Sequence, residues 1–373
     1  MEKIGLFGGS FDPVHIEHIS IAKEAIKLLN LDKLIIIPTN IAPHKKDADA
    51  ISGEDRFNML KLAFAGEKNV EISDFEIKNK GVSYSYLTVT HYANLYKNSS
   101  LYFLMGSDML YNFPTWKSPE VITKLSNLVL ISRSGSEALN DRAIKTIKEL
   151  YNHKVINLNI IGKNLSSTDI RTRLKLSLPI NNLTSSSVIN YICKNNLYEG
   201  DALYKYVVKT LPEKRRVHTL GVITTAKKLA KQLGANEKQV EIASLLHDIA
   251  KYEDYKNYTE FKLPENCPKD VIHQFLGEFI ARTKLNVKDE GVLNAIKYHT
   301  TGRANMSLLE KIVYVADLIE PSRTYKMVDD IRKAVFEDFE SGFKYSVNEV
   351  LNFLQEGGGE VYYLTLESAK YYS

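Results

Sequence analysis

A glycine-rich corner near the start of the chain contains residue types that hold phosphate groups. The segment Gly8–Phe11 follows a short apolar run and precedes His15 and His18, which begin a helical pattern. Glycines let backbone N–H groups approach an anion closely, and a helix N-terminus adds about half a positive charge. Two histidines three residues apart share one helix face, where each can donate to a phosphate oxygen. The corner is therefore predicted to bind the phosphates of a nucleotide.

Other interpretations of this corner are weaker. It lacks the Gly-Lys-Ser/Thr ending of a P-loop and the spacing of a dinucleotide-binding fingerprint, which excludes both motifs. A single histidine at a helix start is more often a cap or a packing residue. Two histidines on one face, directly after a glycine corner, favour the binding role.

The second half of the chain contains a different set of chemical groups. Five helical patterns each turn a histidine or an aspartate toward their apolar side, and one further aspartate adjoins them. The residues are His218, His247, Asp248, His273, His299 and Asp317. Each alone would be a hydrogen-bonded core residue, but a cluster of buried polar groups is costly unless something binds it. Imidazole and carboxylate suit iron, manganese or zinc more than calcium, so the pattern predicts a metal site.

The elements that position the glycine corner alternate between strand and helix. The apolar runs are Lys3–Phe7, Lys33–Pro38, Val70–Ile77, Leu101–Met105, Leu128–Ser132 and Lys154–Leu158. The helical patterns between them include Ile16–Leu29, Glu54–Ala65 and Tyr86–Tyr96, and the second has a capping-box pattern at Ser52–Asp55. Continuously apolar runs are typical of strands buried on both faces. The alternation predicts an α/β, doubly wound parallel sheet with its ligand at the carboxyl ends of the strands.

From about residue 205 the sequence changes to helical periodicity. The predicted helices are Val217–Leu233, Glu237–Lys251, Lys269–Lys284, Asp289–His299 and Ser307–Glu320. An all-α domain is therefore expected. Because a helical pattern ends near Tyr198 and Gly200 permits a turn, we predict domains at residues 1–199 and 200–373.

Length and composition agree with two folded domains. The chain has 373 residues, more than one domain of about 100–200 residues usually holds. Its formal charge of +4 is spread along the chain, which disfavours a long nucleic-acid tract as partner. The two cysteines form no CxxC motif, and no apolar run reaches the roughly 20 residues of a membrane span. Without a signal-like segment either, the expected compartment is the cytoplasm, and the oligomeric state stays open, a homo-oligomer included.

The glycine corner and several later segments resemble bacterial nicotinate-nucleotide adenylyltransferases, members of the nucleotidyltransferase superfamily with an HxGH motif. The later segments are Pro43–Lys45, Ser83–Ser85, Gly106–Asp108, Pro114–Trp116, Ser132–Arg133 and Ser166–Arg171. They keep the family order and cover roughly residues 1–198. The resemblance implies a Rossmann-like domain in which ATP, with magnesium on its phosphates, adenylylates nicotinate mononucleotide and releases pyrophosphate.

The resemblance also implies a role for each matching residue. The catalytic residues that it implies are His15, His18, Lys45 and Arg171. The nucleotide-binding residues are Gly8, Gly9, Ser10, Phe11, Gly106, Asp108, Ser166, Ser167 and Thr168, and the substrate-binding residues are Tyr84, Ser85, Trp116 and Arg133. Trp116 would stack on the pyridine ring. Structural roles remain as alternatives: Trp116 as a packed loop aromatic, Asp108 as a helix N-cap and Lys45 as a solvated charge.

One position departs from the family motif. The glycine of HxGH is replaced by Glu17. A glutamate that points to solvent would favour the helix start through the macrodipole, whereas one that points inward would repel ATP. Other acceptors also stay open, namely nicotinamide mononucleotide and phosphopantetheine.

The order of His218, His247-Asp248 and Asp317 resembles the HD-domain metal-dependent phosphohydrolases. His273 and His299 match the subset with two metals, and residues 245–251, 298–303 and 314–321 are similar to bacterial symmetrical diadenosine-tetraphosphate hydrolases. The resemblance implies iron, with manganese or zinc as alternatives, and two ADP from each diadenosine tetraphosphate. Lys251 is implied as a catalytic cation and Arg303 as another, although both could form surface ion pairs. A non-catalytic nucleotide sensor is the alternative for this half.

Overall fold

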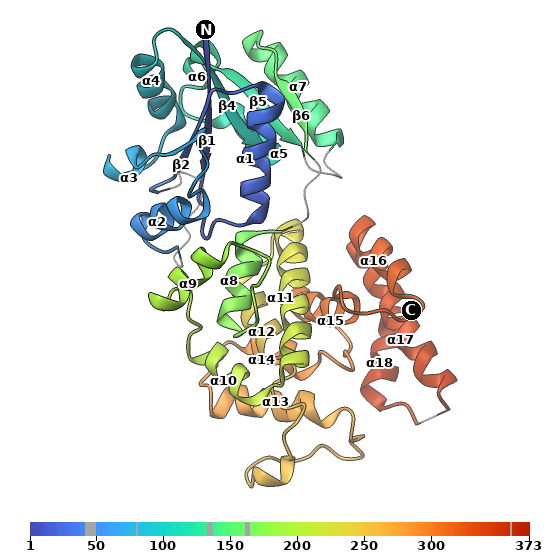
Figure 1. Cartoon of the computed structure of the whole chain (residues 1–373). Coiled ribbons are helices and arrows are strands. Elements are labelled where there is room, and N and C mark those ends of the chain that lie inside the picture. The colour runs from blue at the N-terminus through green and yellow to red at the C-terminus, as the bar shows by residue number, and fades with distance from the viewer. Residues whose placement is uncertain (42–49, 80, 133–136, 161–164, 359) are drawn as a thin grey trace. The chain divides into compact units, whose positions relative to one another are not determined.

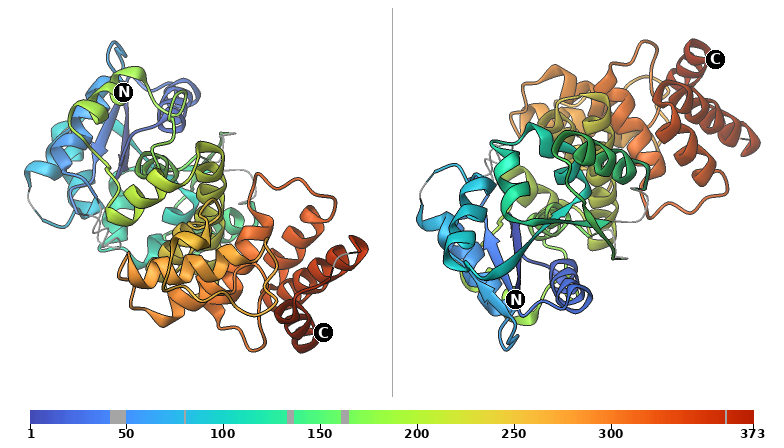
Figure 2. Two further views of the ribbon diagram at one scale, coloured as in Figure 1. Left: turned by 90° about the horizontal axis from the view of Figure 1, so that it is seen from below. Right: turned by 90° about the horizontal axis from the view of Figure 1, so that it is seen from above.

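The computed structural model describes residues 1–41, 50–79, 81–132, 137–160, 165–358 and 360–373 (Figures 1 and 2). The chain divides into two compact units. The first unit comprises Met1–Arg171 and Ile180–Tyr198, and the second comprises Thr172–Pro179 and Glu199–Ser373. Residues 172–179 thus belong to the second unit, although residues of the first unit follow them in the sequence.

The first unit contains a parallel sheet of six strands among its described residues. The strands are β1 (Glu2–Gly9), β2 (Lys33–Pro38), β3 (Val70–Ile72), β4 (Ser99–Gly106), β5 (Asn127–Ser132) and β6 (Ile156–Asn159). Their order is β3-β2-β1-β4-β5-β6, with Phe7 of β1 opposite Ile36 on one side and Leu104 on the other. This order confirms the predicted doubly wound α/β fold, and its topological switch point lies between β1 and β4.

Helices connect these strands or follow the last of them (Figure 1). They are α1 (Ile16–Leu29), α2 (Gly53–Ala63), α3 (Phe75–Lys78), α4 (Ser85–Leu95), α5 (Ser107–Asn112), the 3-10 helix η1 (Phe113–Thr115), α6 (Pro119–Leu125), α7 (Glu137–Tyr151), α8 (Ser167–Lys175) and α9 (Ser186–Lys194). Ser52 caps α2 as predicted, because its hydroxyl accepts the Asp55 N–H at 3.0 Å. The core between helices and sheet includes Ile4, Ile35 and Leu130, each fully buried.

One predicted strand is wrong in its second half. The run Val70–Ile77 was expected to be a single strand, but β3 ends at Ile72 and α3 begins at Phe75. The Ser73 hydroxyl accepts the Phe75 N–H at 3.1 Å, which turns the backbone out of the sheet. A side-chain hydrogen bond of this kind competes with strand pairing, and the apolar pattern alone does not reveal it.

The described residues of the second unit form helices and loops without a strand, as predicted for an all-α domain. Its helices are α10 (Ala202–Thr210), α11 (Glu213–Leu233), α12 (Glu237–Leu246), the 3-10 helix η2 (Tyr255–Asn257), α13 (Ile272–Thr283), α14 (Glu290–Lys297), α15 (Leu308–Ile319), α16 (Val328–Glu337), α17 (Phe339–Glu356) and α18 (Tyr363–Tyr372). Side chains of Asp201, Asn236, Asp289 and Ser307 accept N–H bonds at the starts of α10, α12, α14 and α15. The predicted helix Glu237–Lys251 is too long, since α12 ends at Leu246.

Two hydrophobic clusters support these helices. One joins Leu245, Leu276 and Val292, and it includes Leu176 and Leu178 from the segment 172–179. The Arg216 side chain also donates to the Ser177 carbonyl at 3.0 Å, which explains why this segment belongs to the second unit. The other cluster holds α17 and α18 against α15 and α11.

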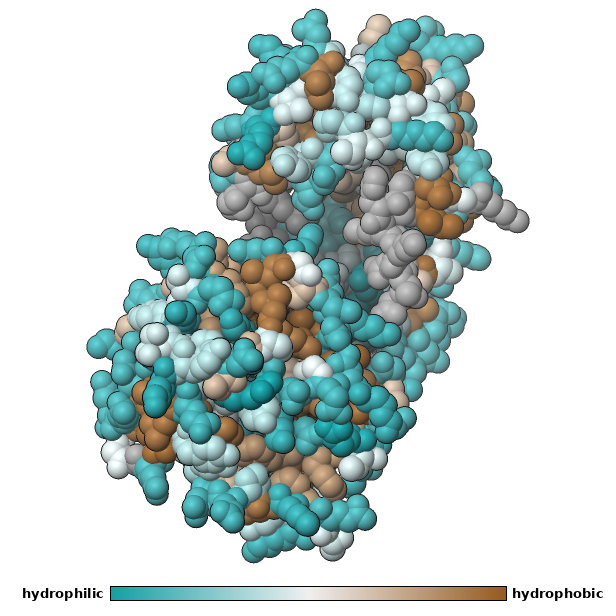
Figure 3. Space-filling model, turned by 180° about the vertical axis from the view of Figure 1, so that it is seen from behind, coloured by the Kyte–Doolittle hydropathy of each residue, from teal (hydrophilic) through white to brown (hydrophobic). Residues whose placement is uncertain are grey.

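The surface is predominantly hydrophilic on the face that Figure 3 shows, with hydrophobic side chains gathered in small areas. Among the described residues, no helix combines the length and the apolar character that crossing a membrane requires.

Candidate functional site

The predicted phosphate corner forms at the carboxyl end of β1. His15 caps α1 with an extended backbone, and its N–H donates to Nδ1 of His18 at 3.2 Å. The two imidazole rings stack with their centroids 3.6 Å apart. Because Nδ1 of His18 accepts a hydrogen bond, the neutral ring carries its proton on Nε2, where it can donate to an anion. The structure thus brings both histidines together at the first turn of the helix.

Space for a ligand adjoins this corner at the switch point. Gly8 and Gly106 lie at the carboxyl ends of the neighbouring strands β1 and β4. A Cβ atom added at either glycine would meet no described atom within 4 Å. The described part of the chain therefore leaves these two strands uncovered at Gly8 and Gly106, as a nucleotide-binding sheet requires.

The start of α8 lies against the same corner. The Ser167 hydroxyl donates to the Pro13 carbonyl at 2.9 Å, and Arg171 donates to the Asp12 carbonyl at 2.7 Å. Nη1 of Arg171 also lies 3.6 Å from Oδ2 of Asp12, with which it forms an ion pair. A charged guanidinium and a helix N-terminus therefore accompany the two histidines.

Four other residues predicted to bind the nucleotide make contacts with their own surroundings in the first unit. The Ser166 hydroxyl accepts the Asp169 N–H at 3.1 Å, so Ser166 caps α8. The Thr168 hydroxyl accepts a long hydrogen bond of 3.4 Å from Arg171. The Ser10 carbonyl accepts from Arg56, and Phe11 is buried with its ring edge-on to Phe7 and His18.

The residues predicted to bind the pyridine ring come from two loops. Tyr84 and Ser85 begin α4, and Trp116 follows η1. The Lys117 ammonium lies 4.5 Å from the centroid of the Tyr84 ring, which links these loops. Trp116 is half-buried, with its ring 5.4 Å from that of Phe113, so part of the indole is in the packing and part is accessible.

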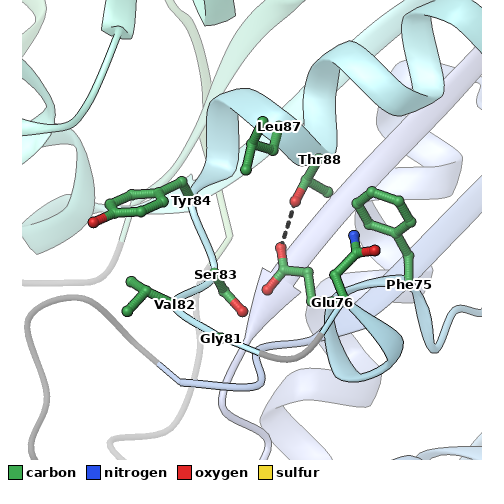
Figure 4. A pocket seen from close by; sticks show the side chains of 9 residues that line it. Phe75, Glu76, Gly81, Val82, Ser83, Tyr84, Leu87 and Thr88 are labelled. Atoms are coloured by element: carbon green, nitrogen blue, oxygen red, sulfur yellow. Dashed lines mark hydrogen bonds between the residues drawn. The ribbon is translucent and has the colours of Figure 1, made fainter.

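A small pocket lies on the other side of Tyr84, as Figure 4 shows. Glu76 and Thr88 point toward each other across it and share a hydrogen bond of 2.6 Å, whereas the Tyr84 ring points away. Burial raises the pKa of Glu76 above its usual value. With a volume of about 30 Å³ the pocket has room for water but not for a pyridine ring.

The remaining predicted residues of the first half are placed as follows. Asp108 is exposed in the first turn of α5, whose N-cap is Gly106, so Asp108 is not the cap. Glu17, which replaces the motif glycine, is only 7% exposed and therefore does not extend into solvent. Lys45 and Arg133 lie outside the described residues.

The six predicted metal ligands of the second half meet at one centre. His218 is on α11, His273 on α13 and Asp317 on α15, while His247, Asp248 and His299 directly follow α12 and α14. They form two groups whose ligand atoms lie within 4.8 Å of one another. The groups are His218, His247 and Asp248, and Asp248, His273 and His299. Asp317 joins the first group, because its Oδ1 lies 3.0 Å from Nε2 of His218.

The hydrogen bonds of the imidazoles suit metal ligands. Nδ1 of His247 lies 2.7 Å from the Ser244 carbonyl, and Nδ1 of His299 lies 2.8 Å from the Ile296 carbonyl. Both rings therefore donate through Nδ1 and turn a lone pair on Nε2 toward Asp248. Anchoring of the second nitrogen is the usual arrangement of histidines that hold a metal. The donor set, which is buried imidazole with carboxylate, fits a divalent transition metal.

The electrostatics of the centre agree with this arrangement. Burial by itself raises the pKa of Asp248, but the His247 and His299 imidazoles outweigh it and hold the pKa well below its usual range. Burial, with His299 adding to it, lowers the pKa of His273 to about 3. Asp248 is therefore a carboxylate and His273 a neutral imidazole at neutral pH, the states in which both bind metals.

The two predicted cations of this half have different surroundings. Nζ of Lys251 lies 3.3 Å from Nε2 of His273, so this ammonium is at the centre. Arg303 makes a two-point ion pair with Glu310, at 2.6 and 3.1 Å, and lies over the Tyr298 ring. Arg303 therefore has the structural ion pair that was the alternative to its functional role.

Comparison with known proteins places both halves in families. A cytidylyltransferase-like model matches residues 6–173, and an HD domain model matches residues 215–322. A relative from Mycoplasma genitalium, named "Probable nicotinate-nucleotide adenylyltransferase/Ap4A hydrolase", is 31% identical over 367 residues, which covers 95% of this chain and 99% of that protein. The chain belongs to this family of adenylyltransferases fused to an HD domain.

Shorter proteins match its halves. A nicotinate-nucleotide adenylyltransferase of Clostridium novyi, named as probable, is 37% identical and covers 53% of this chain and 100% of its own length. A solved structure from Clostridium acetobutylicum, described as a "predicted HD superfamily hydrolase involved in NAD metabolism", is 37% identical. It covers 46% of this chain and 94% of its own, with a TM-score of 0.43.

Two arginines of this adenylyltransferase–HD chain were not predicted from the sequence. Arg215 lies 2.8 Å from Oδ2 of Asp248, and Arg323 lies 2.5 Å from Oδ1 of Asp317. Arg215 is three residues before His218 on α11, so the helical spacing could have identified it. Arg323 follows Pro321 outside any helix, and no periodicity indicates it.

The adenylyltransferase unit has an unpredicted arginine as well. Arg56 is 4% exposed and donates to the carbonyls of Ser10, Ile51 and Asn40. Burial lowers the pKa of its guanidinium. Arg56 therefore fixes the backbone that leads out of β1, and its place in an amphipathic helical pattern gave no sign of this.

Tyr198 supports the corner from the far end of the unit. Its hydroxyl donates to Oδ1 of Asp12 at 2.6 Å, and its side chain is 8% exposed. Burial raises the pKa of Tyr198, and the Asp12 carboxylate adds to the shift, so the phenol keeps its proton. Asp12 in turn contacts Arg171, and the tyrosine thereby stabilises the phosphate corner.

We expect Tyr198→Phe to lower the free energy of unfolding of the first unit by about 1.5–3 kcal/mol, because a hydrogen bond to a buried carboxylate is lost. Urea titration followed by tryptophan fluorescence measures this, since Trp116 is the one tryptophan and lies in this unit. Tyr191→Phe is the control: it removes a phenol–carboxylate bond to Asp55 of 2.9 Å that is only partly buried. A loss no larger than that of the control would contradict the role of Tyr198.

Proposed function

We propose that this chain is a bifunctional cytoplasmic enzyme of nucleotide metabolism. Residues 1–199 would transfer AMP from ATP to nicotinate mononucleotide, which gives nicotinate adenine dinucleotide and pyrophosphate. Residues 200–373 would hydrolyse diadenosine tetraphosphate to two molecules of ADP. Membership of the family supports the transferase reaction, and the name of one relative together with the sequence resemblance supports the specific hydrolase reaction.

The arrangement of the phosphate corner is the observation that supports the transferase proposal most strongly. The stacked His15 and His18, the N-terminus of α1 and the open strand ends at Gly8 and Gly106 meet at the switch point of the sheet. This combination of donors and space suits the triphosphate of a nucleotide.

The proposed transfer needs no covalent enzyme intermediate. A phosphate oxygen of nicotinate mononucleotide forms a bond to the α-phosphorus of ATP, and the bond from that phosphorus to the β-phosphate bridging oxygen breaks in line with it. Pyrophosphate leaves with the electron pair of the broken bond. The protein then contributes alignment of the two nucleotides and neutralisation of charge on the phosphoryl oxygens.

Each residue of the corner would have its own role in this transfer. Nε2–H of His18 would donate to an oxygen of the transferring phosphate, with His15 beside it. Arg171, held against Asp12, and Lys45 would neutralise the β- and γ-phosphates, whose remaining charge magnesium would screen. Tyr84 and Trp116 would hold the pyridine ring, and Asp108 would bind the ATP ribose.

For the hydrolase half, the supporting observation is the convergence of six metal-type ligands with Asp248 common to both groups. His218, His247, Asp248 and Asp317 would hold one metal, and His273 and His299 would complete a second site with Asp248. Iron is the first expectation, with manganese or zinc as alternatives. A divalent metal there would supply Lewis acidity for hydrolysis of a polyphosphate.

The protein groups around this centre would bind the polyphosphate chain. Arg215, Arg323 and Lys251 are cations that adjoin Asp248, Asp317 and His273. They suit the four phosphates between two adenosines better than a single phosphate, because several positive charges surround one centre. A sensor without catalysis could lose some ligands without harm, and the complete set favours an enzyme.

A paired assay tests both reactions. Purified chain receives ATP, magnesium and one acceptor, which is nicotinate mononucleotide, nicotinamide mononucleotide or phosphopantetheine. In separate tubes it receives diadenosine tetraphosphate with iron, manganese or zinc. We expect nicotinate adenine dinucleotide in the first series and ADP in the second. Preference for another acceptor would overturn the transferase assignment, and absence of ADP with every metal would overturn the hydrolase assignment.

Trp116→Ala should raise the KM for nicotinate mononucleotide about tenfold or more while leaving the KM for ATP within about twofold, because stacking of an aromatic ring contributes about 1–3 kcal/mol. Initial rates at varied concentrations of each substrate measure the two constants. Trp116→Phe is the matched control, since a smaller ring retains most of the stacking. Equal effects on both KM values would assign Trp116 to packing alone.

A further inference from the structure

A buried carboxylate that is not among the six ligands contacts the metal centre. Glu320 follows the last residue of α15 and is 1% exposed. Its Oε1 lies 3.0 Å from Nδ1 of His218. The Ser322 N–H donates to Oε2 at 2.7 Å, and the Ser322 hydroxyl donates to Oε1. The carboxylate is therefore held in place from two sides, with His218 on one of its oxygens.

The position of His218 explains why a side chain is needed there. His247 and His299 lie just past the ends of α12 and α14, and they anchor Nδ1 on the carbonyls of Ser244 and Ile296. His218 lies inside the 21-residue helix α11, where backbone carbonyls already accept bonds from the next turn. A carbonyl of its own helix is not available to this ring, and the Glu320 carboxylate takes that place.

A glycine on α11 provides the space for this contact. Gly221 is three residues after His218 and therefore on the same face of the helix. A Cβ atom added at Gly221 would overlap the Glu320 carboxylate. Glycine is among the least favourable residues inside a helix, so its presence in the middle of α11 needs a reason. The close approach of Glu320 supplies one.

We propose that Glu320 is a positioning residue for the metal centre, with Gly221 as the gap that admits it. The Glu320 carboxylate accepts a hydrogen bond from Nδ1–H of His218 and so keeps the Nε2 lone pair available for a metal ion. Nε2 faces Asp317 at 3.0 Å and Nε2 of His247 at 3.3 Å, which is the side of the centre. This inference rests on the metal site of the proposed function.

Metal affinity tests this role without reference to catalysis. Full-length chain is stripped of metal with a chelator and titrated with Mn²⁺ in a calorimeter. Glu320→Ala should weaken Mn²⁺ binding by about 10- to 100-fold, as loss of such a partner usually does. Glu320→Gln should recover most of the affinity, because the amide oxygen can still accept from Nδ1. Gly221→Ala should weaken binding as well, since the methyl group displaces the carboxylate.

Glu310→Gln is the matched control. Glu310 is also buried at 1% exposure, lies on α15, which Glu320 follows, and pairs with Arg303 instead of a ligand. It should lose thermal stability and retain Mn²⁺ affinity within twofold. Failure of the wild-type chain to bind Mn²⁺ would reject the metal site itself. A wild-type chain that binds, together with unchanged affinity in folded Glu320→Ala or Gly221→Ala, would overturn the role of Glu320.

Discussion

Asp248→Ala should reduce hydrolysis of diadenosine tetraphosphate by about a thousandfold or more, because a metal contributes several kcal/mol of transition-state stabilisation. Asp248 is common to both ligand groups. Its Oδ1 lies 3.3 Å from Nε2 of His273, and its Oδ2 lies 3.4 Å from Nε2 of His247. Removing this carboxylate takes a ligand from each group, so metal binding by both groups should weaken. Separation of the nucleotides by chromatography and elemental analysis of bound metal measure the two effects.

Asp289→Ala is the control for this substitution. Asp289 caps α14, accepts the Val292 N–H at 3.1 Å and is not among the metal ligands. It should lose some stability while retaining metal and hydrolysis. Adenylyl transfer should be unchanged in both variants, since Asp248 lies in the second unit. Retention of both metal and hydrolysis by folded Asp248→Ala would contradict the proposed centre.

His18→Ala should lower kcat/KM for adenylyl transfer by about 100- to 1,000-fold, the usual effect of removing a donor that stabilises transition-state charge. The 3.2 Å bond from the His15 N–H to Nδ1 of His18 places the remaining proton on Nε2, and no other atom of the ring can replace it. The KM for ATP should change much less than kcat, because the donor acts mainly on charge that develops during transfer. Initial rates of nicotinate adenine dinucleotide formation measure both constants.

His153→Ala provides the comparison in the same unit. Its Nε2 accepts a hydrogen bond from the Leu128 N–H at 3.3 Å. Leu128 is near the start of β5, so His153 lies at the amino ends of the strands and not at the carboxyl ends where His18 lies. Its transfer rate should stay within twofold of the wild-type rate. A His18→Ala variant that is as active as His153→Ala would remove the histidine pair from the proposed mechanism.

The arrangement of strands and helices could be predicted because its signals are local. Continuous apolar runs such as Lys33–Pro38 indicated strands buried on both faces, and α1 was predicted with its observed bounds, Ile16–Leu29. Val70–Ile77 was wrong because Ser73 binds its own backbone, and hydrophobicity does not register such a bond. Likewise, no sequence signal indicated that residues 172–179 pack with the helical unit.

The sequence predicted the metal-type ligands of the candidate site but not the charged residues that contact them. Histidine and aspartate on apolar helix faces are conspicuous, because such residues are rare there unless they are paired or bound. Arg323 and Glu320 come from a non-helical turn after α15, and only the folded chain brings them to Asp317 and His218. The sequence did not indicate the buried position of Arg56, since an arginine on an amphipathic helix normally faces solvent.

The membership of residues 172–179 limits how such fusions can exchange parts. Leu176 and Leu178 complete a helical core, whereas Ile180–Tyr198, which comes later in the gene, returns to the sheet unit and carries the tyrosine that holds Asp12. A recombination event with one crossover, at either 171 or 199, would leave one partner without part of its interior. Exchange of the helical unit with the contacts of its core kept would therefore have to include residues 172–179 as well as Glu199–Ser373.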